Sequence, residues 1–577
     1  MKNQELAKIF FEIAELLEMK EVQFKPRAFE KAARSIEALD EDVRDIYKKG
    51  GIKALEEIPG VGRGIAERIE EYLKHHHIKD YERLKKQMPV DISGLTAIEG
   101  VGPKLIQLLY KKLKVRNVRD LERAAKSGKL KKLPRIGAKL EQKILKGIEF
   151  QRVHMGRMNI GEALLLARTI LGRLEKAPGV TAVEPAGSLR RWKESVGDLD
   201  FLVISSKPKE VMKIFVSMPE VEGVLARGDT KSSVRLRAGI DADVRVLPPK
   251  SFGAALQYFT GSKDHNILLR KIAIKKGYKL NEYGLFRGRR LVAGKSEEEI
   301  YKKLGLDWMP PEIRLASGEI EAAQKHTLPK LIGYDDLKGD LQIQTSWTDG
   351  ANSIEEMARE AKRLGHEYIA ITDHTKSLAM TGGSDEKKLL RQMKEIDRLN
   401  KKISGIRILK SAEVNIKKDG ALDILDDVLA KLDIVGAAVH SHFNLSEKEQ
   451  TERLISAMEN PHVDIIFHPT TRIPQRREPI HLDYEKLFKT ARRTGTMLEI
   501  NAHPWRLDLK DEHIREAKKF GVKFVINTDA HSMGELSYLE YGIAQARRGW
   551  CEKKDVLNTL PLKRFLEVLK KPKSERF

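Results

Sequence analysis

The sequence predicts a multidomain protein with an all-α N-terminal part, an α+β middle part and a C-terminal β/α barrel. Three observations lead to this prediction. A glycine-containing helical hairpin recurs between residues 55 and 137, two strands carry paired aspartates between residues 198 and 243, and strands after residue 340 repeatedly end in histidine or aspartate. A chain of 577 residues is also too long for one core, so several domains are expected.

The chain carries a formal net charge of +23. Such an excess favours polyanionic partners, because neutralised phosphates release their condensed counterions. The Lys- and Glu-rich surface of a heat-adapted protein would give a similar composition. Charge alone therefore leaves both interpretations open, and the motifs must decide between them.

Composition also excludes several classes of protein. The only cysteine, Cys551, excludes internal disulfides and a cysteine-based zinc site. No apolar run approaches the roughly 18 residues of a membrane span. Residues 1–20 are typical of an amphipathic helix and not of a signal peptide, because acidic residues interrupt the apolar positions. We therefore expect a soluble, cytoplasmic monomer.

The hairpin pattern occurs at residues 55–62, at 95–102 and, more weakly, at 130–137. Each copy has a hydrophobic residue, a tight turn with glycine and then an amphipathic helix. Glycine lets the backbone approach a phosphate, and the N–H groups that start the next helix point at it. Apolar stripes are expected after the first two turns, at Ile65, Ile69, Tyr72 and Leu73 and at Leu105, Leu108 and Leu109.

This pattern resembles the helix-hairpin-helix motif, which binds DNA without reading its sequence. For a single copy, an ordinary turn with a glycine cap is the alternative. The resemblance implies that carbonyls of Ile58 and Val61, and of Ile98 and Val101, are offered to a Na⁺ or K⁺ ion that bridges to phosphate. The DNA contacts that it implies are Gly60, Val61, Gly62, Gly100, Val101 and Gly102.

The two acid-bearing strands are predicted at residues 199–204 and 240–246. Asp198 and Asp200 are two residues apart, so their carboxylates point to the same side, and Asp243 belongs to a pair with the same period. Crowded carboxylates repel one another, and divalent cations relieve the repulsion. The pattern therefore indicates two Mg²⁺ (or Mn²⁺) ions that promote phosphoryl transfer, although a solvated strand edge or a structural Ca²⁺ site would explain one pair alone.

A short turn precedes these strands. Gly187 and Ser188 are followed by Arg190 and Arg191. A small backbone, a hydroxyl and a guanidinium form a cradle for a triphosphate tail. Together with the aspartates at this spacing, the turn predicts a nucleotidyltransferase.

The chain up to roughly residue 316 resembles the family X DNA polymerases, to which DNA polymerase beta belongs. The resemblance implies that Asp198 and Asp200 bind both metal ions. It also implies that Asp243, which Val-Arg-Val-Leu-Pro follows, completes the primer-end site and accepts the 3′-hydroxyl proton. Asp241 lies on the same face but fits the family pattern less well.

The same resemblance assigns the nucleotide contacts. Ser188 and Arg191 would hold the β- and γ-phosphates beside Gly187, and the family often has glycine where this chain has Trp192. The segment 258–266 looks like the nucleotide-selecting segment. There, Tyr258 and Phe259 would exclude a 2′-hydroxyl, Asn266 would touch the minor-groove edge of the incoming base, and Arg270 would approach the template. A helix start with an aromatic core contact is the alternative.

Residues 24–33, with the first hairpin, resemble the polymerase beta lyase domain, which works through a Schiff base on a lysine. The matching position here is Arg68, and a guanidinium stays protonated, so no lyase is expected by that route. Lys74 or another amine remains open as a substitute. Lys25, Arg27 and Lys31 are candidate contacts to a 5′-phosphate.

In the C-terminal part, strands are predicted at residues 368–372, 434–439, 465–467, 497–500 and 524–527. Their polar endings are Asp373-His374, His440-Ser-His442, His468, Asn501-Ala-His503 and Thr-Asp529-Ala-His531. Polar residues at strand ends are what the catalytic face of a β/α barrel requires. The region resembles the PHP domain, a seven-stranded barrel with up to three Mn²⁺ or Zn²⁺ ions that hydrolyses phosphoesters. One implied ion site is Glu413, His440 and His468, and another is Asp349, His374 and His531.

The third implied site should combine a His-x-His pair with Glu413 and Asp529. Here the pair reads Gln342-Ile-Gln344. A glutamine carbonyl is a weaker donor to Mn²⁺ or Zn²⁺ than imidazole, so this ion should be lost or weakened. We therefore expect a weakened or absent 3′-5′ exonuclease, with a purely structural barrel as the alternative.

The expected order of domains is a polymerase beta-like helix-hairpin-helix domain at 1–90, a second such domain at 91–148, a palm at 149–247, a thumb at 248–316, a linker at 317–335 and a PHP domain at 336–577. The expected function is template-directed filling of short DNA gaps from dNTPs in repair. Two alternatives remain: a repair nuclease or AP endonuclease that uses the barrel, and a non-catalytic scaffold for DNA ends.

Overall fold

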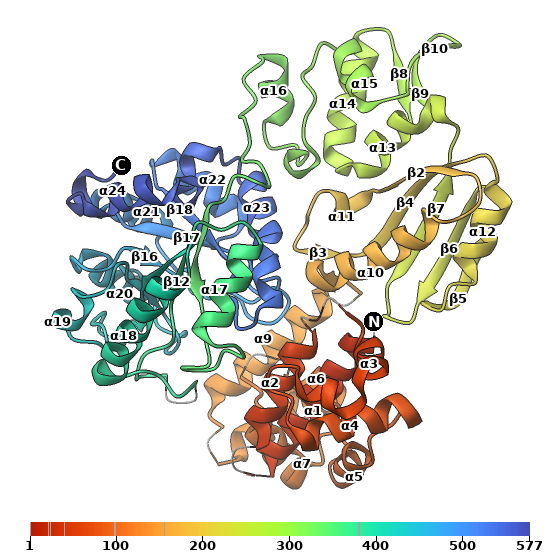
Figure 1. The fold of residues 1–577 in the computed structure, drawn as a ribbon. Coiled ribbons are helices and arrows are strands. Elements are labelled where there is room, and N and C mark those ends of the chain that lie inside the picture. The colour runs from red at the N-terminus through yellow and green to blue at the C-terminus, as the bar shows by residue number, and fades with distance from the viewer. Residues whose placement is uncertain are drawn as a thin grey trace.

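The computed structural model describes residues 2–577 apart from residues 21, 23, 24, 38, 40, 97, 99, 135, 155, 379 and 380, and apart from the side chains of residues 2, 4, 139 and 150–154. Residue 24 of the lyase-like segment and residues 97, 99 and 135 of the hairpins thus lie outside the described residues. Along the chain follow a helical part, a five-stranded sheet, a small α+β part and a barrel (Figure 1).

The N-terminal part is helical and has one hydrophobic core. Its central helix, α1, packs against α2, α5 and α7. The helices are α1 (Lys2–Met19), α2 (Lys25–Glu37), α3 (Val43–Glu56), α4 (Arg63–His75), α5 (Lys79–Gln87), α6 (Ile92–Thr96), α7 (Pro103–Leu113), α8 (Val118–Lys126) and α9 (Ala138–His154), with a 3₁₀ turn at Leu130–Lys132.

The two predicted apolar stripes have different outcomes. The first is confirmed in α4, which buries Ile65, Ile69 and Tyr72 and partly buries Leu73. The second was partly wrong: in α7 the fully buried residues are Ile106 and Leu109. Leu105 and Leu108 are only half-buried. Residues 106 and 109 face the core because a helical period of 3.6 places them on one stripe, with 105 and 108 at its edge.

The middle part is built on a sheet with the strand order β2-β4-β7-β6-β5. Strands β4 and β7 run parallel, and all other neighbours run antiparallel. Helices α10 and α12 pack against this sheet. The elements are β1 (Met158–Asn159), α10 (Ile160–Leu174), β2 (Val180–Pro185), α11 (Gly187–Arg190), β3 (Ser195–Val196), β4 (Asp198–Ser205), α12 (Pro208–Val216), β5 (Val221–Arg227), β6 (Lys231–Leu236) and β7 (Asp241–Val246).

A smaller part follows, with the elements α13 (Phe252–Thr260), α14 (Lys263–Lys275), β8 (Lys279–Asn281), β9 (Gly284–Arg287), β10 (Arg290–Ala293), α15 (Glu297–Lys303) and α16 (Glu319–Gln324). Helix α16 lies in the segment predicted as a linker. Its carboxylate Glu319 is fully buried and contacts Nδ1 of the buried His265 on α14 at 2.8 Å. This stretch of the predicted linker is therefore fixed to the smaller part.

The C-terminal part is a distorted barrel of parallel strands. Strands β11 (Gly339–Ile343), β12 (Tyr368–Ile371) and β13 (Arg407–Lys410) form one sheet, and β14 (Glu413–Asn415), β15 (Gly436–Ala438), β16 (Ile465–Ile466), β17 (Met497–Asn501) and β18 (Phe524–Asn527) form the other. Bridges from His374 to Glu413 and from Ile343 to Ala530 join the two sheets. Strands β13 and β14 follow each other along the chain at one place in the barrel and count there as a single strand. The described strands therefore occupy the seven strand positions that the resemblance implies. The five strands predicted from the sequence are confirmed.

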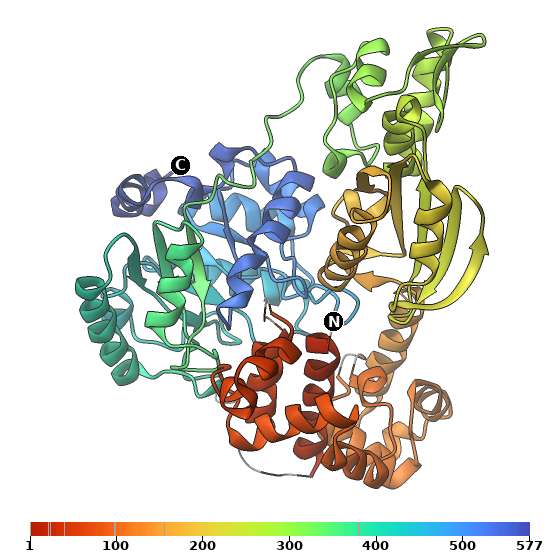
Figure 2. The same cartoon turned by 45° about the vertical axis from the view of Figure 1, so that its right-hand side comes forward.

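Helices surround the barrel: α17 (Ile354–Arg363), α18 (Glu386–Lys402), α19 (Asp426–Leu429), α20 (Glu447–Glu459), α21 (Tyr484–Thr494), α22 (Asp511–Lys519), α23 (Leu539–Arg548) and α24 (Leu562–Lys570). Figures 1 and 2 show α23 on the side of the barrel that faces the middle part. Across this boundary Arg168 of α10 pairs with Glu540 of α23 at 2.6 Å.

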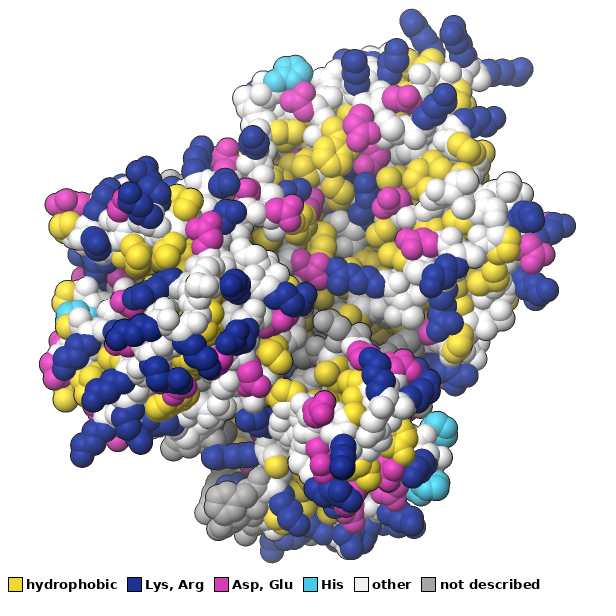
Figure 3. Space-filling view, viewed as in Figure 1, with side chains coloured by type: hydrophobic (Ala, Val, Ile, Leu, Met, Phe, Trp, Pro, Cys, Tyr) yellow, Lys and Arg dark blue, Asp and Glu magenta, His cyan; other side chains and the backbone are white. Residues whose placement is uncertain are grey.

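The positive charge is not gathered in one place on the face seen in Figure 3. Lys and Arg are spread over all its parts and are mixed with Asp and Glu. None of the helices in the described part of the chain is long and apolar enough to cross a membrane.

Candidate functional site

The predicted catalytic aspartates meet on adjoining parallel strands. The register of β4 and β7 pairs Asp198 with Asp241 and Asp200 with Asp243. Asp241 accepts a hydrogen bond from Arg235 of the neighbouring strand β6. Asp243 has a more distant cation, Arg245, at 3.9 Å. The geometry therefore favours Asp243 over Asp241 as the third metal-binding carboxylate.

The electrostatics of this group fit divalent cations. Burial, Asp198 and Asp243 raise the pKa of Asp200 to about 7. Three carboxylates that oppose each other's ionisation offer hard oxygen donors, which Mg²⁺ prefers. The side chains present therefore fit the metal-binding role predicted for Asp198, Asp200 and Asp243.

Gly187 lies directly against this group. Its φ is +61°, and a Cβ atom built on it would come within 2.6 Å of Asp200 Oδ2. Glycine is required here both by the left-handed backbone and by the close approach of the carboxylate. Ser188 follows on α11 and is half-buried, so the predicted phosphate cradle lies beside the aspartates.

The two arginines of this turn have different surroundings. Arg190 pairs with Glu297 of α15 at 2.8 Å and so links α11 to the smaller part. The Arg191 guanidinium donates to the carbonyl of Thr260 at the end of α13. Arg191 thus lies between the phosphate turn and the nucleotide-selecting segment, as its predicted role requires.

The nucleotide-selecting segment forms the end of α13 and the start of α14. Tyr258 and Phe259 contact each other edge to face, with ring centroids 5.1 Å apart. Arg245 lies over the Phe259 ring at 4.4 Å. Both aromatic rings are half-buried, so this geometry leaves them available to a sugar.

Asn266 is oriented by a residue that the sequence did not single out. Gln257 Nε2 donates to Asn266 Oδ1 at 2.7 Å, and Asn266 Nδ2 donates to the Tyr258 carbonyl at 2.7 Å. Arg270 is exposed one helical turn later. A polar residue within a helix is common and does not by itself indicate that it orients a neighbouring side chain. Gln257 could therefore not be selected from the sequence.

The hairpins present glycine at the surface. Gly60 and Gly100 have φ values of +78° and +86° and are exposed. Gly62 and Gly102, also exposed, are the N-cap residues of α4 and α7 and form no side-chain cap, so the first N–H groups of each helix stay open to an anion. The intervening Val61 and Val101 are buried and anchor each turn.

The predicted 5′-phosphate contacts lie on α2. Lys25 and Arg27 are exposed and Lys31 is half-buried. The Lys31 side chain lies against the first hairpin, because a Cβ atom on Gly60 would come within 2.7 Å of its Cγ. The structure therefore places Lys31 beside the hairpin that is predicted to hold the DNA backbone.

Arg68, which stands where the resemblance implies the lyase lysine, is held by several contacts. Arg68 pairs with Asp80, donates to the Gly64 carbonyl and lies over the Phe29 ring at 5.7 Å. Hydrogen bonding to Glu70 raises the pKa of Lys74. Because only a neutral amine forms a Schiff base, this shift makes Lys74 a poorer substitute.

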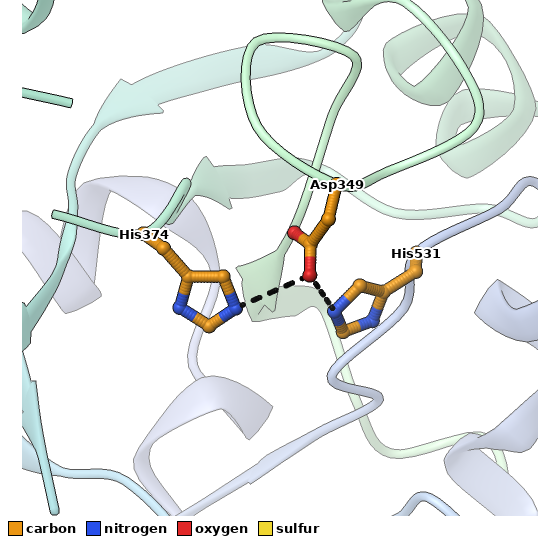
Figure 4. A group of neighbouring side chains, drawn as sticks. All are labelled: Asp349, His374 and His531. Carbon is orange, nitrogen blue, oxygen red and sulfur yellow. Dashed lines mark ion pairs between the residues drawn. The ribbon is translucent and has the colours of Figure 1, made fainter. Parts of the chain in front are cut away.

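In the barrel, Asp349, His374 and His531 converge as predicted (Figure 4). Asp349 Oδ2 lies 3.7 Å from Nε2 of each histidine, and the three ligand atoms lie within 4.8 Å of one another. These separations exceed hydrogen-bond length but suit atoms that share one ion. The buried Asp349 Oδ1 has no hydrogen-bond partner among the described side chains and backbone, so this group fits a metal ion.

Glu413 joins a second group. Its Oε1 lies 2.9 Å from His440 Nε2 and 2.8 Å from His468 Nε2. Although burial alone would raise the pKa of Glu413, His374 and His440 hold it well below its usual range. Burial lowers the pKa of His440 and brings that of His468 to about 4, which favours the neutral imidazoles that bind metals.

The tautomer of His440 is set by Asn415, a residue that was not predicted from the sequence. Asn415 Nδ2 donates to Asp423 at 3.0 Å, so its Oδ1 faces His440 Nδ1, 2.7 Å away, as an acceptor. A neutral His440 therefore carries its proton on Nδ1 and directs the Nε2 lone pair toward Glu413. Two acceptors that face each other fit a shared cation. Asn415 could have been found, because it stands two residues after Glu413 on the same strand.

The third predicted site is different. Gln344 Nε2 donates to Glu413 Oε2 at 2.7 Å, and its carbonyl oxygen accepts from Thr372 Oγ1 at 3.1 Å. The amide therefore presents hydrogens, and not a carbonyl, to the carboxylates. Gln342 directs its own oxygen to Asn501 Nδ2 at 3.2 Å. Neither glutamine is placed as a metal ligand.

An arginine side chain lies at the predicted third metal site. Arg506 Nε lies 3.0 Å from Asp529 Oδ2, and the Arg506 side chain is only 25% exposed. Its guanidinium compensates the negative charge of the Asp529 carboxylate, which a metal ion would otherwise neutralise. The donor set therefore does not fit a third metal ion. The sequence offered no signal for Arg506, which lies in a loop.

Comparison with known proteins gives matches along most of the chain. Family models match residues 1–78 (helix-hairpin-helix domain), 92–149 (SAM-like helix-hairpin-helix tandem), 255–315 (DNA polymerase beta thumb) and 340–503 (PHP domain). The chain is 39% identical over 576 residues to the DNA polymerase/3′-5′ exonuclease PolX of Bacillus subtilis (strain 168), which covers 99% of this chain and 100% of the relative.

Shorter relatives match part of the chain. A probable phosphatase of Thermoanaerobacter sp. (strain X514) is 33% identical over 233 residues, which are 38% of this chain and 89% of the relative. One from Acetivibrio thermocellus is 34% identical over 233 residues, with 38% and 90% covered. The whole-length match has 39% identity, and the thumb and PHP models match the corresponding parts of the chain. This chain therefore belongs to the family X DNA polymerases, as a DNA-directed nucleotidyltransferase with helix-hairpin-helix domains and a C-terminal PHP domain.

Proposed function

We propose that this polymerase fills short gaps in duplex DNA during repair. We also propose that it is a cytoplasmic monomer and that its domains have the boundaries predicted above. The observation that carries the catalytic part is the parallel register that sets Asp200 beside Asp243. Without an added cation these carboxylates oppose each other, and burial together with that opposition raises the pKa of Asp200.

The reaction is attack of a primer 3′-hydroxyl on the α-phosphate of a dNTP, with release of pyrophosphate. Bound Mg²⁺ or Mn²⁺ would stabilise the charge on the reacting oxygens, and Asp198, Asp200 and Asp243 would hold it. Asp243 accepts the hydroxyl proton, while Ser188 and Arg191 hold the β- and γ-phosphates.

The remaining contacts choose the nucleotide and hold the DNA. Tyr258 and Phe259 exclude a ribose by shape, Asn266 reads the minor-groove edge of the base and Arg270 approaches the template. The glycines at both hairpins accept the DNA backbone with a bridging Na⁺ or K⁺ ion. Lys25, Arg27 and Lys31 hold the 5′-phosphate.

In the PHP domain we propose two Mn²⁺ or Zn²⁺ sites, at Asp349, His374 and His531 and at Glu413, His440 and His468. The place beside Asp529 holds no ion, because Gln344 and Arg506 already satisfy its carboxylates. The 3′-5′ exonuclease named for the B. subtilis relative is therefore weak or absent in this chain.

The test is primer extension on a duplex with a one-nucleotide gap, with and without dNTPs. Templated growth should occur with Mg²⁺ and should be lost in the isosteric variant Asp198→Asn/Asp200→Asn. Primer shortening without dNTPs, unaffected by that variant and lost in His440→Ala, would instead support the repair nuclease. Failure of the wild type to extend any primer would refute the polymerase proposal.

A further inference from the structure

We propose that the PHP domain positions the nucleotide-binding turn of the palm, residues 187–194, and that Arg548 and Trp192 are positioning residues for the incoming dNTP. The inference rests on the proposed role of this turn as the triphosphate cradle. It assigns the barrel a part in polymerisation that needs no metal ion in the barrel.

The first contact is a hydrogen bond to the turn backbone. Arg548 Nη1, at the end of α23, donates to the carbonyl oxygen of Arg191 at 2.9 Å. Nη2 of the same guanidinium pairs with Asp511, and Arg548 is only 7% exposed. A buried, charge-assisted bond with a fixed donor has one geometry, so it determines where the Arg191 backbone lies.

The second contact is an aromatic one. Trp192 has a φ of +52°, in the left-handed region that residues other than glycine rarely adopt. The centroid of its ring lies 6.0 Å from that of Tyr334, in the segment before the barrel. It lies 5.9 Å from the ring centroid of Tyr541 on α23, and these two rings meet edge to face. A strained backbone persists where surrounding contacts over-determine it, and here part of those contacts come from the PHP domain.

A third contact holds the far end of the turn. Glu194 accepts from Arg472 Nη2 at 2.7 Å, and the same guanidinium nitrogen donates to the Leu507 carbonyl. The turn is thus attached to the barrel through a carbonyl, a ring and a carboxylate at positions 191, 192 and 194.

The opposite side of Arg191 explains why its position matters. Its guanidinium donates to the Thr260 carbonyl of the nucleotide-selecting segment. The side chain must leave or share this acceptor when it binds phosphate, so the contacts made by Arg548, Trp192 and Glu194 help to keep the residue in place. Loss of those contacts should weaken dNTP binding more than the chemical step or the binding of DNA.

The experiment measures single-nucleotide gap filling by the full-length protein as a function of dNTP concentration. Arg548→Ala should raise the KM for dNTP about tenfold, the effect of losing one charge-assisted hydrogen bond, with kcat within about twofold. Arg548→Lys, which keeps one charged donor, should recover part of the loss. The affinity for gapped DNA, measured by fluorescence anisotropy, should not change.

The matched control is Arg168→Ala, which breaks another palm–PHP ion pair without touching the turn. Trp192→Gly is a second variant, because glycine accepts the same backbone while the ring contacts are lost. An unchanged KM in both Arg548→Ala and Trp192→Gly, or an equal rise in Arg168→Ala, would overturn the inference. An inactive wild type would refute the proposed function itself, and the inference with it.

Discussion

The aspartate group of the palm and the predicted third site of the barrel both gather carboxylates, but the fold compensates their charge differently. In the palm, burial and the two neighbouring aspartates raise the pKa of Asp200 to about 7. In the barrel, Gln344 donates to Glu413 and Arg506 pairs with Asp529. The carboxylates are similar, and their neighbours differ.

This difference shows which acidic groups need an ion from outside. Carboxylates that the chain leaves facing one another are stabilised by a bound cation, whereas carboxylates that already have donors gain little from one. The same rule separates two residues of a single strand. Asp241 accepts a hydrogen bond from Arg235 at 3.1 Å, while the cation near Asp243, Arg245, is 3.9 Å away.

The largest effect is expected from breaking the palm group. Asp243→Asn should reduce gap-filling activity on the order of a thousandfold, because it removes a metal-binding and proton-accepting carboxylate. Asp241→Asn, on the same strand and face, should stay within about fivefold. Steady-state extension rates at saturating Mg²⁺ provide the measurement. Equal losses in the two variants would contradict the distinction between them.

An intermediate effect is expected from restoring imidazoles to the barrel. Gln342→His/Gln344→His should bind about one additional Mn²⁺ per chain and raise 3′-5′ exonuclease activity at least about tenfold. Metal content after gel filtration and digestion of a 3′-labelled strand are the measurements. Gln342→Asn/Gln344→Asn, which supplies no imidazole, is the control. If the histidine variant gains neither metal nor activity, Arg506 alone is enough to keep the site metal-free.

The smallest effect concerns stability without metal. Because the pKa of Asp200 in the folded protein is raised from 3.8 to about 7, folding loses stability as the pH rises between these values. Asp200→Asn should therefore stabilise the metal-free protein at pH 8 by about 1–3 kcal/mol, and the gain should vanish below about pH 4. Thermal unfolding in EDTA at both pH values measures it. A variant less stable than wild type at pH 8 would argue against uncompensated charge in the palm.

Much of the architecture followed from local pattern. The period of two places Asp198 beside Asp200, and pairing of two such strands brings in Asp243, so the palm group was predictable. Helical and strand periods also predicted the first hairpin and the five barrel strands. The apolar stripe of the second hairpin helix was misplaced because adjacent leucines leave the direction of the core open.

What could not be predicted depends on segments far apart in the chain. Arg506 and Gln257 acquire their roles from loop and helix positions that no periodicity marks. The contact between Arg548 and Arg191 joins residues 357 positions apart across two domains. Such contacts depend on how whole domains dock, and the sequence pattern of either partner carries no record of this.

The buried contact between His265 and Glu319 has a practical consequence for anyone dividing this polymerase into parts. A cut at the predicted end of the thumb, residue 316, would remove α16 and leave His265 Nδ1 without its carboxylate partner, one residue before Asn266, while Tyr301 stays beside Nε2. Desolvated polar groups without partners destabilise their surroundings. A polymerase fragment that retains α16, ending after residue 324, should therefore be easier to produce in folded form than one that ends where the sequence pattern changes.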